Sequence, residues 1–287
     1  MSEGGSIDSG TSMGAVRLVV ADLDRLRDFY RDAIGLSELP PEDGTVRLGT
    51  DGEPIIELVG EPDAPPRAHG TSGLFHLAIR VPSRQDLARA LQRVAEAGWR
   101  LSGASDHLVS EALYLSDPEG NGIELYRDRP REEWPVRDGV IQMDTLPLDL
   151  DGVLGDLRRE DANTGMPPGT RIGHVHLNVG DLAAAEAFYS GALGFDVTVR
   201  GYPGALFVSA GGYHHHLGLN TWAGEGAPPP PHGTRGLLRF EIVLPSAESL
   251  SAEENRLLEA GFEPIREDDG VRATDPSGNH VLLTTRA

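Results

Sequence analysis

Hydrophobic and polar positions along the chain follow one arrangement that occurs twice. In residues 16–36, VRLVVADLDRLRDFYRDAIGL, a strand-like alternation is followed by apolar residues at helical spacing. Residues 175–195, VHLNVGDLAAAEAFYSGALGF, repeat this arrangement 159 positions later. Each copy predicts a strand, an aspartate that caps the next helix, and a glycine that ends that helix. The capping residues are Asp22 and Asp181, and the closing glycines are Gly35 and Gly194.

A second arrangement also occurs twice, in residues 73–99 and again 163 positions later in residues 236–262. Each copy predicts a strand and a helix, followed by strands that end in a DPxGN turn, at residues 117–121 and 275–279. Recurrence of one pattern indicates a single supersecondary element that is used several times. The sequence therefore predicts an α+β protein built from four βαβββ repeats, two in each half.

These patterns divide the 287 residues into two domains. Residues 1–12 are predicted to be a flexible leader, and residues 13–128 the first domain. Residues 129–170 form a linker, in which the segment 149–161 predicts a short helix. Residues 171–287 form the second domain. Each domain is long enough to have a hydrophobic core of its own.

The amino-acid composition limits the partners and the catalytic groups that the protein can use. The formal charge is −20 and all 25 basic residues are arginine, which disfavours nucleic acid and anionic membranes as partners and excludes Schiff-base chemistry on lysine. There is no cysteine, so a metal would need His, Asp or Glu ligands. No apolar run approaches the roughly 18 residues of a membrane span, and the first residues lack a signal-peptide pattern. We therefore predict a cytoplasmic protein.

One carboxylate stands out within the strand predicted at residues 123–126. Ile123 and Leu125 share one face of that strand, so Glu124 points to the other face. A glutamate that points into the face of a sheet is costly unless a cation or hydrogen bonds compensate it. Glu124 is therefore a candidate metal ligand.

The repeat pattern resembles the vicinal oxygen chelate superfamily, which includes glyoxalases, bleomycin-resistance proteins and extradiol dioxygenases. The likeness is carried by the DL…FY…LGF type of segment in both halves and by residues 103–124, which are similar to the extradiol ring-cleavage signature. Ser105 departs from that signature. Two-domain catechol 2,3-dioxygenase-like proteins are the most similar group. The resemblance implies two cups of curved sheet, each made of two βαβββ repeats, and a divalent metal in a working cup.

In this family the extradiol metal is held by two histidines and one glutamate. The matching positions are His76 and Glu124 in the second repeat and His174 in the third. The first and fourth repeats have other residues at the corresponding positions, namely Ala15, Arg239 and Leu282. This distribution predicts that the second repeat pairs with the third. The alternative, pairing first with second and third with fourth, would divide the three ligands between two cups.

Further residues are candidates for the site. The resemblance implies a proton-transfer role for His107 and a substrate hydrogen bond from Tyr114. His176 shares a strand face with His174, and Trp222 is positioned to stack on an aromatic ring. Alternation in residues 213–220 predicts that His214, His216 and Asn220 face the cup, while His215 packs with leucines against a helix. His216 is interpreted as a base, a fourth metal ligand, a substrate contact or a residue that no longer has a role in the site.

The resemblance implies an Fe(II)-dependent extradiol dioxygenase that opens the ring of a catechol-like aromatic diol with O₂. One alternative is a non-oxidative isomerase of the glyoxalase or epimerase type with Mn(II), Zn(II) or Ni(II). Such enzymes carry a second carboxylate, for which only Glu57 and Glu241 are near. Another alternative is a metal-free protein that sequesters an aromatic ligand. The sequence allows a homodimer but does not determine the oligomeric state.

Overall fold

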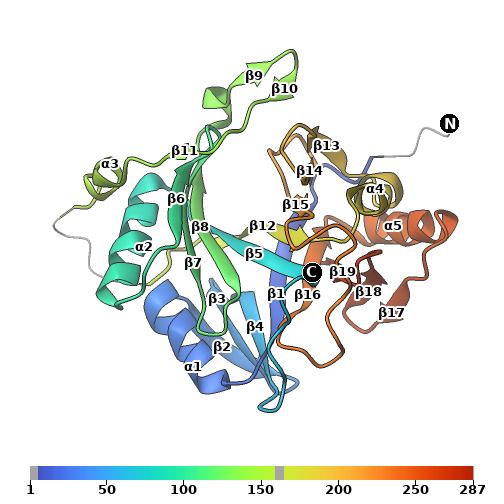
Figure 1. Ribbon diagram of the computed structural model, residues 1–287, viewed down its shortest axis with the longest axis horizontal. Coiled ribbons are helices and arrows are strands. Elements are labelled where there is room, and N and C mark those ends of the chain that lie inside the picture. The colour runs from blue at the N-terminus through green and yellow to red at the C-terminus, as the bar shows by residue number, and fades with distance from the viewer. Residues whose placement is uncertain (1–5, 159–164, 287) are drawn as a thin grey trace. The chain divides into compact units, whose positions relative to one another are not determined.

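The structure is a computed structural model that describes residues 6–158 and 165–286 (Figure 1). Residues 1–5 of the predicted leader and residues 159–164 of the predicted linker lie outside the described residues. The chain divides into two compact units. Unit 1 comprises residues 1–17, 65–75 and 174–287, and unit 2 comprises residues 18–64 and 76–173.

The predicted α+β class with four βαβββ repeats is confirmed. The first two repeats consist of β1 (Ser12–Val20), α1 (Leu23–Asp28) with η1 (Phe29–Ile34), β2 (Ser37–Glu42), β3 (Thr45–Thr50) and β4 (Glu53–Gly60), then β5 (Gly73–Arg80), α2 (Arg84–Glu96), β6 (Gly103–Asp106), β7 (Ser110–Ser116) and β8 (Gly122–Asp128). The last two consist of β12 (Arg171–Asn178), α4 (Leu182–Glu186) with η3 (Ala187–Ala192), β13 (Asp196–Val199), β14 (Ala205–Ser209) and β15 (Leu217–Asn220), then β16 (Gly236–Leu244), α5 (Ala247–Glu259), β17 (Ile265–Glu267), β18 (Gly270–Thr274) and β19 (His280–Thr285).

The strands of each unit lie side by side in mixed sheets. In unit 2 the neighbours follow the orders β11-β6-β7-β8-β5 and β4-β3-β2. In unit 1 they follow the orders β12-β15-β14-β13 and β17-β18-β19-β16. The pairing of the second repeat with the third stays a prediction.

The linker contributes short elements between the halves. It contains η2 (Arg131–Glu133), the hairpin β9 (Val136–Arg137) and β10 (Val140–Ile141), β11 (Leu146–Pro147) and α3 (Leu150–Leu154). Within unit 2, β11 pairs with β6, and α3 confirms the helix predicted at residues 149–161. Arg84 ties α2 to this segment, because its guanidinium donates to Gly152 O and Asp156. In unit 1, Ile7 of the predicted leader is buried and donates to Gly194 O.

The first helix of each half begins and ends as predicted, although its second part is a π-helix. Asp22 accepts a hydrogen bond from Arg25 N, and Asp181 accepts from Ala183 N and Ala184 N. Gly35 and Gly194 close the helices with φ of 94° and 72°, a left-handed conformation that glycine adopts at low cost. Between these ends η1 and η3 have π geometry, which the apolar spacing did not predict.

Each DPxGN turn is fastened to the helix of the preceding repeat by a buried tyrosine. Tyr30 donates to Asp117 at 3.1 Å in unit 2, and Tyr189 donates to Asp275 at 3.0 Å in unit 1. Burial raises the pKa of both aspartates, while hydrogen bonds from the asparagine of the same turn and from the tyrosine oppose that shift. We refer to each set as a turn lock: Tyr30, Asp117 and Asn121 in unit 2, and Tyr189, Asp275 and Asn279 in unit 1.

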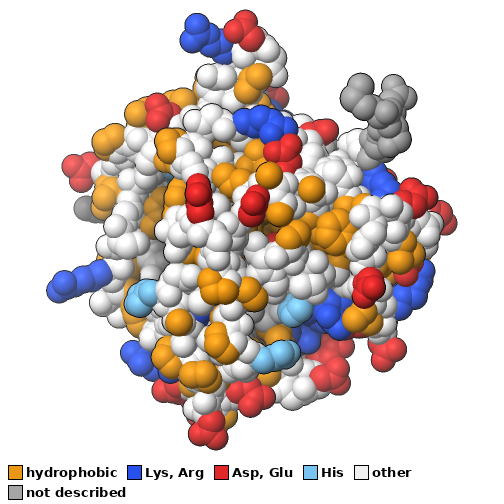
Figure 2. Space-filling view, turned by 45° about the vertical axis from the view of Figure 1, so that its right-hand side comes forward, with side chains coloured by type: hydrophobic (Ala, Val, Ile, Leu, Met, Phe, Trp, Pro, Cys, Tyr) orange, Lys and Arg blue, Asp and Glu red, His pale blue; other side chains and the backbone are white. Residues whose placement is uncertain are grey.

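Charged side chains lie at the surface in a mixed distribution. On the face drawn in Figure 2, arginine and acidic side chains are interspersed. None of the described helices is both long enough and apolar enough to cross a membrane. Several of the arginines are held in ion pairs, such as Arg127 with the buried Glu111 at 2.7 Å.

Candidate metal centre

Glu124, the carboxylate that the sequence singled out, lies on β8 of unit 2. In unit 2, β5 and β8 run parallel, and Ala78 is the register partner of Glu124. His76 lies two residues before Ala78, so His76 and Glu124 project from the same face. His76 Nε2 is 3.0 Å from Glu124 Oε2, and the exposed fractions of the two side chains are 9% and 4%. A histidine and a carboxylate therefore meet in a buried environment.

The second histidine of the predicted triad is on β12. His174, His176 and Asn178 alternate with valine and leucine along this strand, so they share one face. His174 is 2% exposed. The ring of His215 lies against it, with ring centroids 4.1 Å apart. His174 is thus buried among imidazoles in unit 1.

His76, Glu124 and His174 are all buried, and each offers a nitrogen or oxygen atom that can bind a metal ion. Neighbouring ligand atoms about 2.1 Å from a metal ion and at right angles lie about 3.0 Å apart. The separation of His76 Nε2 and Glu124 Oε2 equals this value. Two imidazoles and one carboxylate also match the donor set of non-haem iron and related divalent ions. The residues therefore fit a divalent metal.

His107 and Tyr114 form a hydrogen-bonded pair in unit 2. His107 Nδ1 lies 2.8 Å from Asp144 O, and a carbonyl can only accept, so Nδ1 carries a proton. In the neutral ring Nε2 then accepts from the Tyr114 hydroxyl at 2.6 Å. Tyr114 is the register partner of Glu124, and its ring centroid is 5.7 Å from that of His76. The pair therefore links a proton acceptor to the strand that carries Glu124.

The segment before β15 differs from the alternation that the sequence predicted. The strand begins at Leu217, so residues 214–216 precede it and do not alternate as a strand would. The expectation that His215 packs with leucines is wrong: its ring contacts His174 and Phe207, at 4.1 and 5.1 Å between centroids. The His214 and His215 Nδ1 atoms are 2.8 Å apart. Sequence reasoning thus missed His215, for which the three consecutive histidines were the available signal.

His216 is held by the backbone. Its Nδ1 accepts a hydrogen bond from Ala210 N at 3.1 Å and lies 3.1 Å from Ser209 Oγ. An N–H group can only donate, so Nδ1 is unprotonated and the proton of the neutral ring is on Nε2. In this tautomer His216 offers a hydrogen-bond donor at Nε2, rather than a proton acceptor or a metal ligand.

Asn220 is completely buried at the end of β15, where it is the register partner of Asn178. Its Oδ1 accepts from Trp222 N at 2.9 Å. Its Nδ2 has no hydrogen-bond partner among the described residues. A buried donor without a partner carries a free-energy cost that a bound acceptor would remove.

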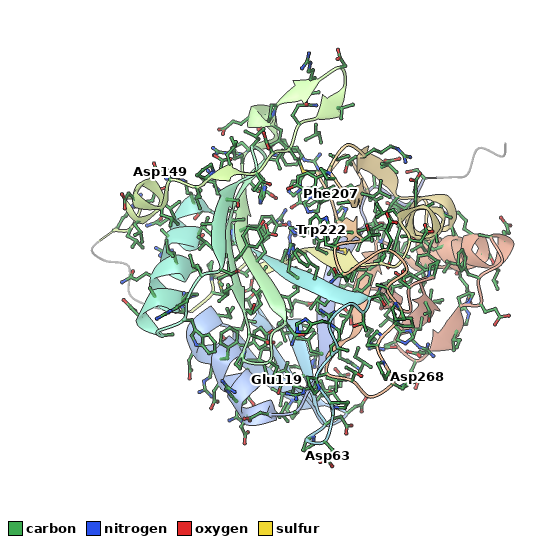
Figure 3. All side chains as sticks on the ribbon, viewed as in Figure 1. Asp63, Glu119, Asp149, Phe207, Trp222 and Asp268 are labelled. Carbon is green, nitrogen blue, oxygen red and sulfur yellow. The ribbon has the colours of Figure 1, made fainter. Side chains whose placement is uncertain are left out.

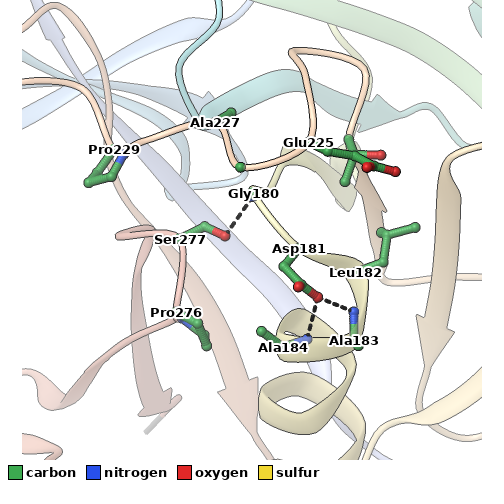
Figure 4. Close-up of a pocket in the computed structure, with 12 residues that line it drawn as sticks. Gly180, Asp181, Leu182, Ala183, Ala184, Glu225, Ala227, Pro229, Pro276 and Ser277 are labelled. Atoms are coloured by element: carbon green, nitrogen blue, oxygen red, sulfur yellow. Dashed lines mark hydrogen bonds between the residues drawn. The ribbon is translucent and has the colours of Figure 1, made fainter.

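A pocket of about 590 Å³ lies elsewhere in unit 1, beside the start of α4 (Figure 4). None of the predicted site residues lines it. Two of its polar side chains are engaged, because Asp181 accepts from Ala183 N and Ala184 N and Ser277 Oγ accepts from Gly180 N. We assign no chemistry to this pocket.

The two glutamates weighed as a second acid or base each have a partner within their own unit. In unit 1, Glu241 on β16 accepts from Ala15 N at 3.0 Å. In unit 2, Glu57 on β4 lies 3.6 Å from Arg47.

Comparison with known proteins bears on this site. The family model of the glyoxalase/bleomycin resistance protein/dioxygenase superfamily matches residues 12–125 and 171–283. The chain belongs to this superfamily. The two matched segments of this superfamily domain coincide with the two pairs of repeats, and the resemblance seen in the sequence is confirmed.

Individual relatives within the superfamily point to ring cleavage. The chain is 44% identical to the catechol-2,3-dioxygenase of Bacillus subtilis over 97% of its own length and 99% of that protein. It is 30% identical to biphenyl-2,3-diol 1,2-dioxygenase 3 of Rhodococcus globerulus over 37% of this chain and 57% of that one. The crystal structure of glyoxalase I from Zea mays superposes with a TM-score of 0.59 at 19% identity, covering 96% of this chain and 92% of that chain. The last likeness concerns the fold alone.

Proposed function

We propose that the protein is an extradiol dioxygenase that opens the ring of a catechol-like aromatic diol with O₂. The observation that carries the proposal is the buried pair of His76 and Glu124, whose Nε2 and Oε2 atoms lie 3.0 Å apart. We assign the buried His174 as the third ligand. The relative named catechol-2,3-dioxygenase supports it, because the 44% identity extends over nearly the whole of both chains.

We assign Fe(II) as the metal, with Mn(II), Zn(II) or Ni(II) as alternatives. A bound divalent ion would act as a Lewis acid that lowers the pKa of the diol and brings both reactants to one centre. His76, Glu124 and His174 would hold it on one side, which leaves adjacent coordination positions for reactants. The remaining chemistry depends on side chains that orient the substrate and move protons.

His107 and Tyr114 are assigned to proton transfer. The neutral His107 accepts at Nε2 from the Tyr114 hydroxyl, so a proton released near Tyr114 can pass to the imidazole and return to the product. The bond from His107 Nδ1 to Asp144 O fixes the ring orientation and stabilises the protonated form. His216 is assigned the role of a hydrogen-bond donor through Nε2.

Residues of unit 1 are assigned to substrate binding. Asn220 would donate from its buried Nδ2 to an oxygen of the substrate. His176 shares the face of His174, and Trp222 is within 5.2 Å of its ring, so both are positioned to contact an aromatic ring. His214 is buried near His174, with centroids 6.5 Å apart, and would shape the same wall.

The test is purification without oxygen, followed by metal analysis and addition of catechol and air. We expect about one iron per chain, oxygen uptake and a yellow ring-opened product. Zinc or nickel without oxygen uptake would indicate the isomerase alternative. A protein without metal that still binds catechol after His76→Ala would indicate the ligand-binding alternative. Either result overturns the proposal.

A further inference from the structure

Arg67 lies in unit 1, in the segment that leads into β5, and its guanidinium is partly buried without a counter-charge. Its Nη1 atom is buried and has no hydrogen-bond partner, and no ion pair involves Arg67 within residues 6–158 and 165–286. Burial lowers the pKa of this guanidinium, and no carboxylate opposes the shift. Removing a cation from water without a partner costs free energy, which a bound anion would reduce.

The backbone holds Arg67 in place from both sides. Before it, Pro65 O accepts a hydrogen bond from Arg235 N at 2.9 Å, and after it Ser72 N donates to Pro228 O at 2.9 Å. Ser72 is completely buried. These bonds fasten the segment that contains Arg67 to a second segment of the same unit. The position of the guanidinium is thus determined without a side-chain partner, which is the property of a preorganised binding group.

Gly73, the first residue of β5, determines how the guanidinium lies. A side chain at this position would come within 2.5 Å of Arg67 Nη1 and 3.6 Å of Cζ, so the guanidinium occupies the space that such a side chain would fill. The φ angle of Gly73 is 122°, a conformation that other residues rarely adopt. Nη1 is turned inward, whereas Nε and Nη2 are not buried. Their two parallel N–H groups match two oxygens of a carboxylate or phosphate group.

The two segments that meet at Arg67 carry no acidic side chain. Residues 65–75 and 226–240 contain no aspartate or glutamate, and their ionisable side chains are those of arginine and histidine. The whole chain has 45 acidic residues and a formal charge of −20, so such segments stand out in it. Elsewhere in unit 1 a carboxylate holds an exposed arginine, as Glu186 holds Arg200 at 2.6 Å. No carboxylate of these two segments competes with a bound anion for Arg67.

We propose that Arg67 is the centre of an anion site, which binds a small oxoanion through a carboxylate or phosphate group. The two groups share the chemistry that the site recognises, namely two oxygens on one atom and a negative charge. The inference is independent of the proposed function, because none of these residues is assigned to the metal or to the diol. A neutral or cationic ligand would leave the charge of the guanidinium without compensation.

The test is calorimetric titration of the protein with sodium phosphate and, separately, with sodium acetate, while sodium chloride keeps the ionic strength constant. We expect one anion per chain. Arg67→Gln should weaken binding at least about tenfold, because hydrogen bonds to charged groups contribute on that scale. Arg67→Lys keeps the charge but loses the planar pair of donors, so its affinity should fall severalfold. Arg200→Gln, at an exposed arginine, is the matched control and should leave the affinity unchanged.

Tighter binding of phosphate would assign the site to phosphate groups, and tighter binding of acetate would assign it to carboxylates. Absence of binding of both anions to the wild type would overturn the inference. So would equal affinity of the wild type and Arg67→Gln, with circular dichroism showing that the variant is folded, because the anion would then bind elsewhere, such as at a metal ion. Oxygen uptake with catechol tests the proposed function separately, and Arg67→Gln should leave it unchanged.

Discussion

The second and fourth repeats have the same fold, but the positions of two proposed metal ligands in the second repeat hold other residues in the fourth. In the second repeat, His76 on β5 meets Glu124 on β8 at 3.0 Å. In the fourth, Arg239 on β16 occupies the position equivalent to His76 and pairs with Glu267 at 3.3 Å and Asp269 at 2.5 Å. Leu282 stands in place of Glu124. A potential ligand pair in one repeat thus corresponds to an arginine with acidic partners in the other.

What the two repeats share is the turn lock. Asp117 and Asp275 each accept from a tyrosine hydroxyl, an asparagine side chain and backbone N–H groups of the turn. The corresponding hydrogen-bond distances in the two turn locks differ by 0.1 Å. The residues of the turn lock are therefore the same in both repeats, whereas the positions of His76 and Glu124 are occupied by Arg239 and Leu282 in the fourth repeat.

The largest effect should come from removing a ligand. Glu124→Gln should lower kcat/KM for ring cleavage by at least about 1,000-fold and abolish stoichiometric iron binding, because the neutral amide is a poor ligand. Glu241→Gln is the matched control: the amide oxygen can still accept from Ala15 N, so activity and iron content should remain within about twofold. Metal analysis and oxygen uptake measure both variants. Equal loss of activity and iron in the Glu124→Gln and Glu241→Gln variants would show that the second repeat has no special role in metal binding.

The next effect concerns the turn locks. Asp117→Ala and Asp275→Ala should each reduce the free energy of unfolding by about 3 kcal/mol, because each leaves a buried tyrosine hydroxyl and an asparagine side chain without their acceptor. Urea denaturation followed by circular dichroism measures the loss. The two values should agree within about 1 kcal/mol. A neutral effect at one turn would show that the locks are not equivalent.

A smaller effect is expected at the arginine that replaces the ligand. Arg239→Met should cost about 1–2 kcal/mol of stability, since Asp269 and Glu267 lose a partly buried partner. Iron content should not change. If iron binding fell with Arg239→Met as it does with His76→Ala, the fourth repeat would have a role in the metal centre.

The smallest effect distinguishes the helices of these two repeats. Glu253 of α5 corresponds to Ala90 of α2, and burial raises its pKa to about 7 despite Arg256 nearby. Because the folded pKa exceeds the unfolded one, its contribution to stability is present below about pH 4.5 and is lost as the pH rises through 7. After allowance for solvent screening, the loss should be about 1 kcal/mol. Urea denaturation at pH 5 and at pH 8 measures the difference in the free energy of unfolding, and Glu253→Gln should remove the part of that difference that comes from Glu253. A variant with the same difference as the wild type would contradict this assignment.

The sequence predicted the fold well because its signals were local and repeated. Caps at Asp22 and Asp181 and closing glycines fixed the helix ends, and the recurrence of one pattern gave the four βαβββ repeats. The pairing of the second repeat with the third, inferred from the positions of His76, Glu124 and His174, stays a prediction. The roles of the individual site residues, the domain boundaries, the cytoplasmic location and a homodimer stay predictions.

Other features depended on information that a pattern does not contain. The position of His215 follows from where β15 begins, and alternation cannot locate a strand end to within two residues. The tautomers of His107 and His216 follow from hydrogen bonds with backbone groups of Asp144 and Ala210. The pattern of hydrophobic and polar residues does not reveal these bonds. The ring contacts of His176 involve Phe75 on β5, Phe207 on β14 and Trp222 after β15, so only the fold brings them together (Phe207 and Trp222 are labelled in Figure 3).

The π-helices show how far the two halves repeat each other. A π segment is rare and short in proteins. Here η1 and η3 end the first helix of each half at positions that correspond within one residue, between Asp22 and Gly35 and between Asp181 and Gly194. Each π segment holds an aromatic pair, Phe29–Tyr30 and Phe188–Tyr189, and the tyrosine of each pair donates to the aspartate of its turn lock. The wider turn of the helix is therefore part of the repeated element, and it positions the hydroxyl that fastens the turn of the next repeat.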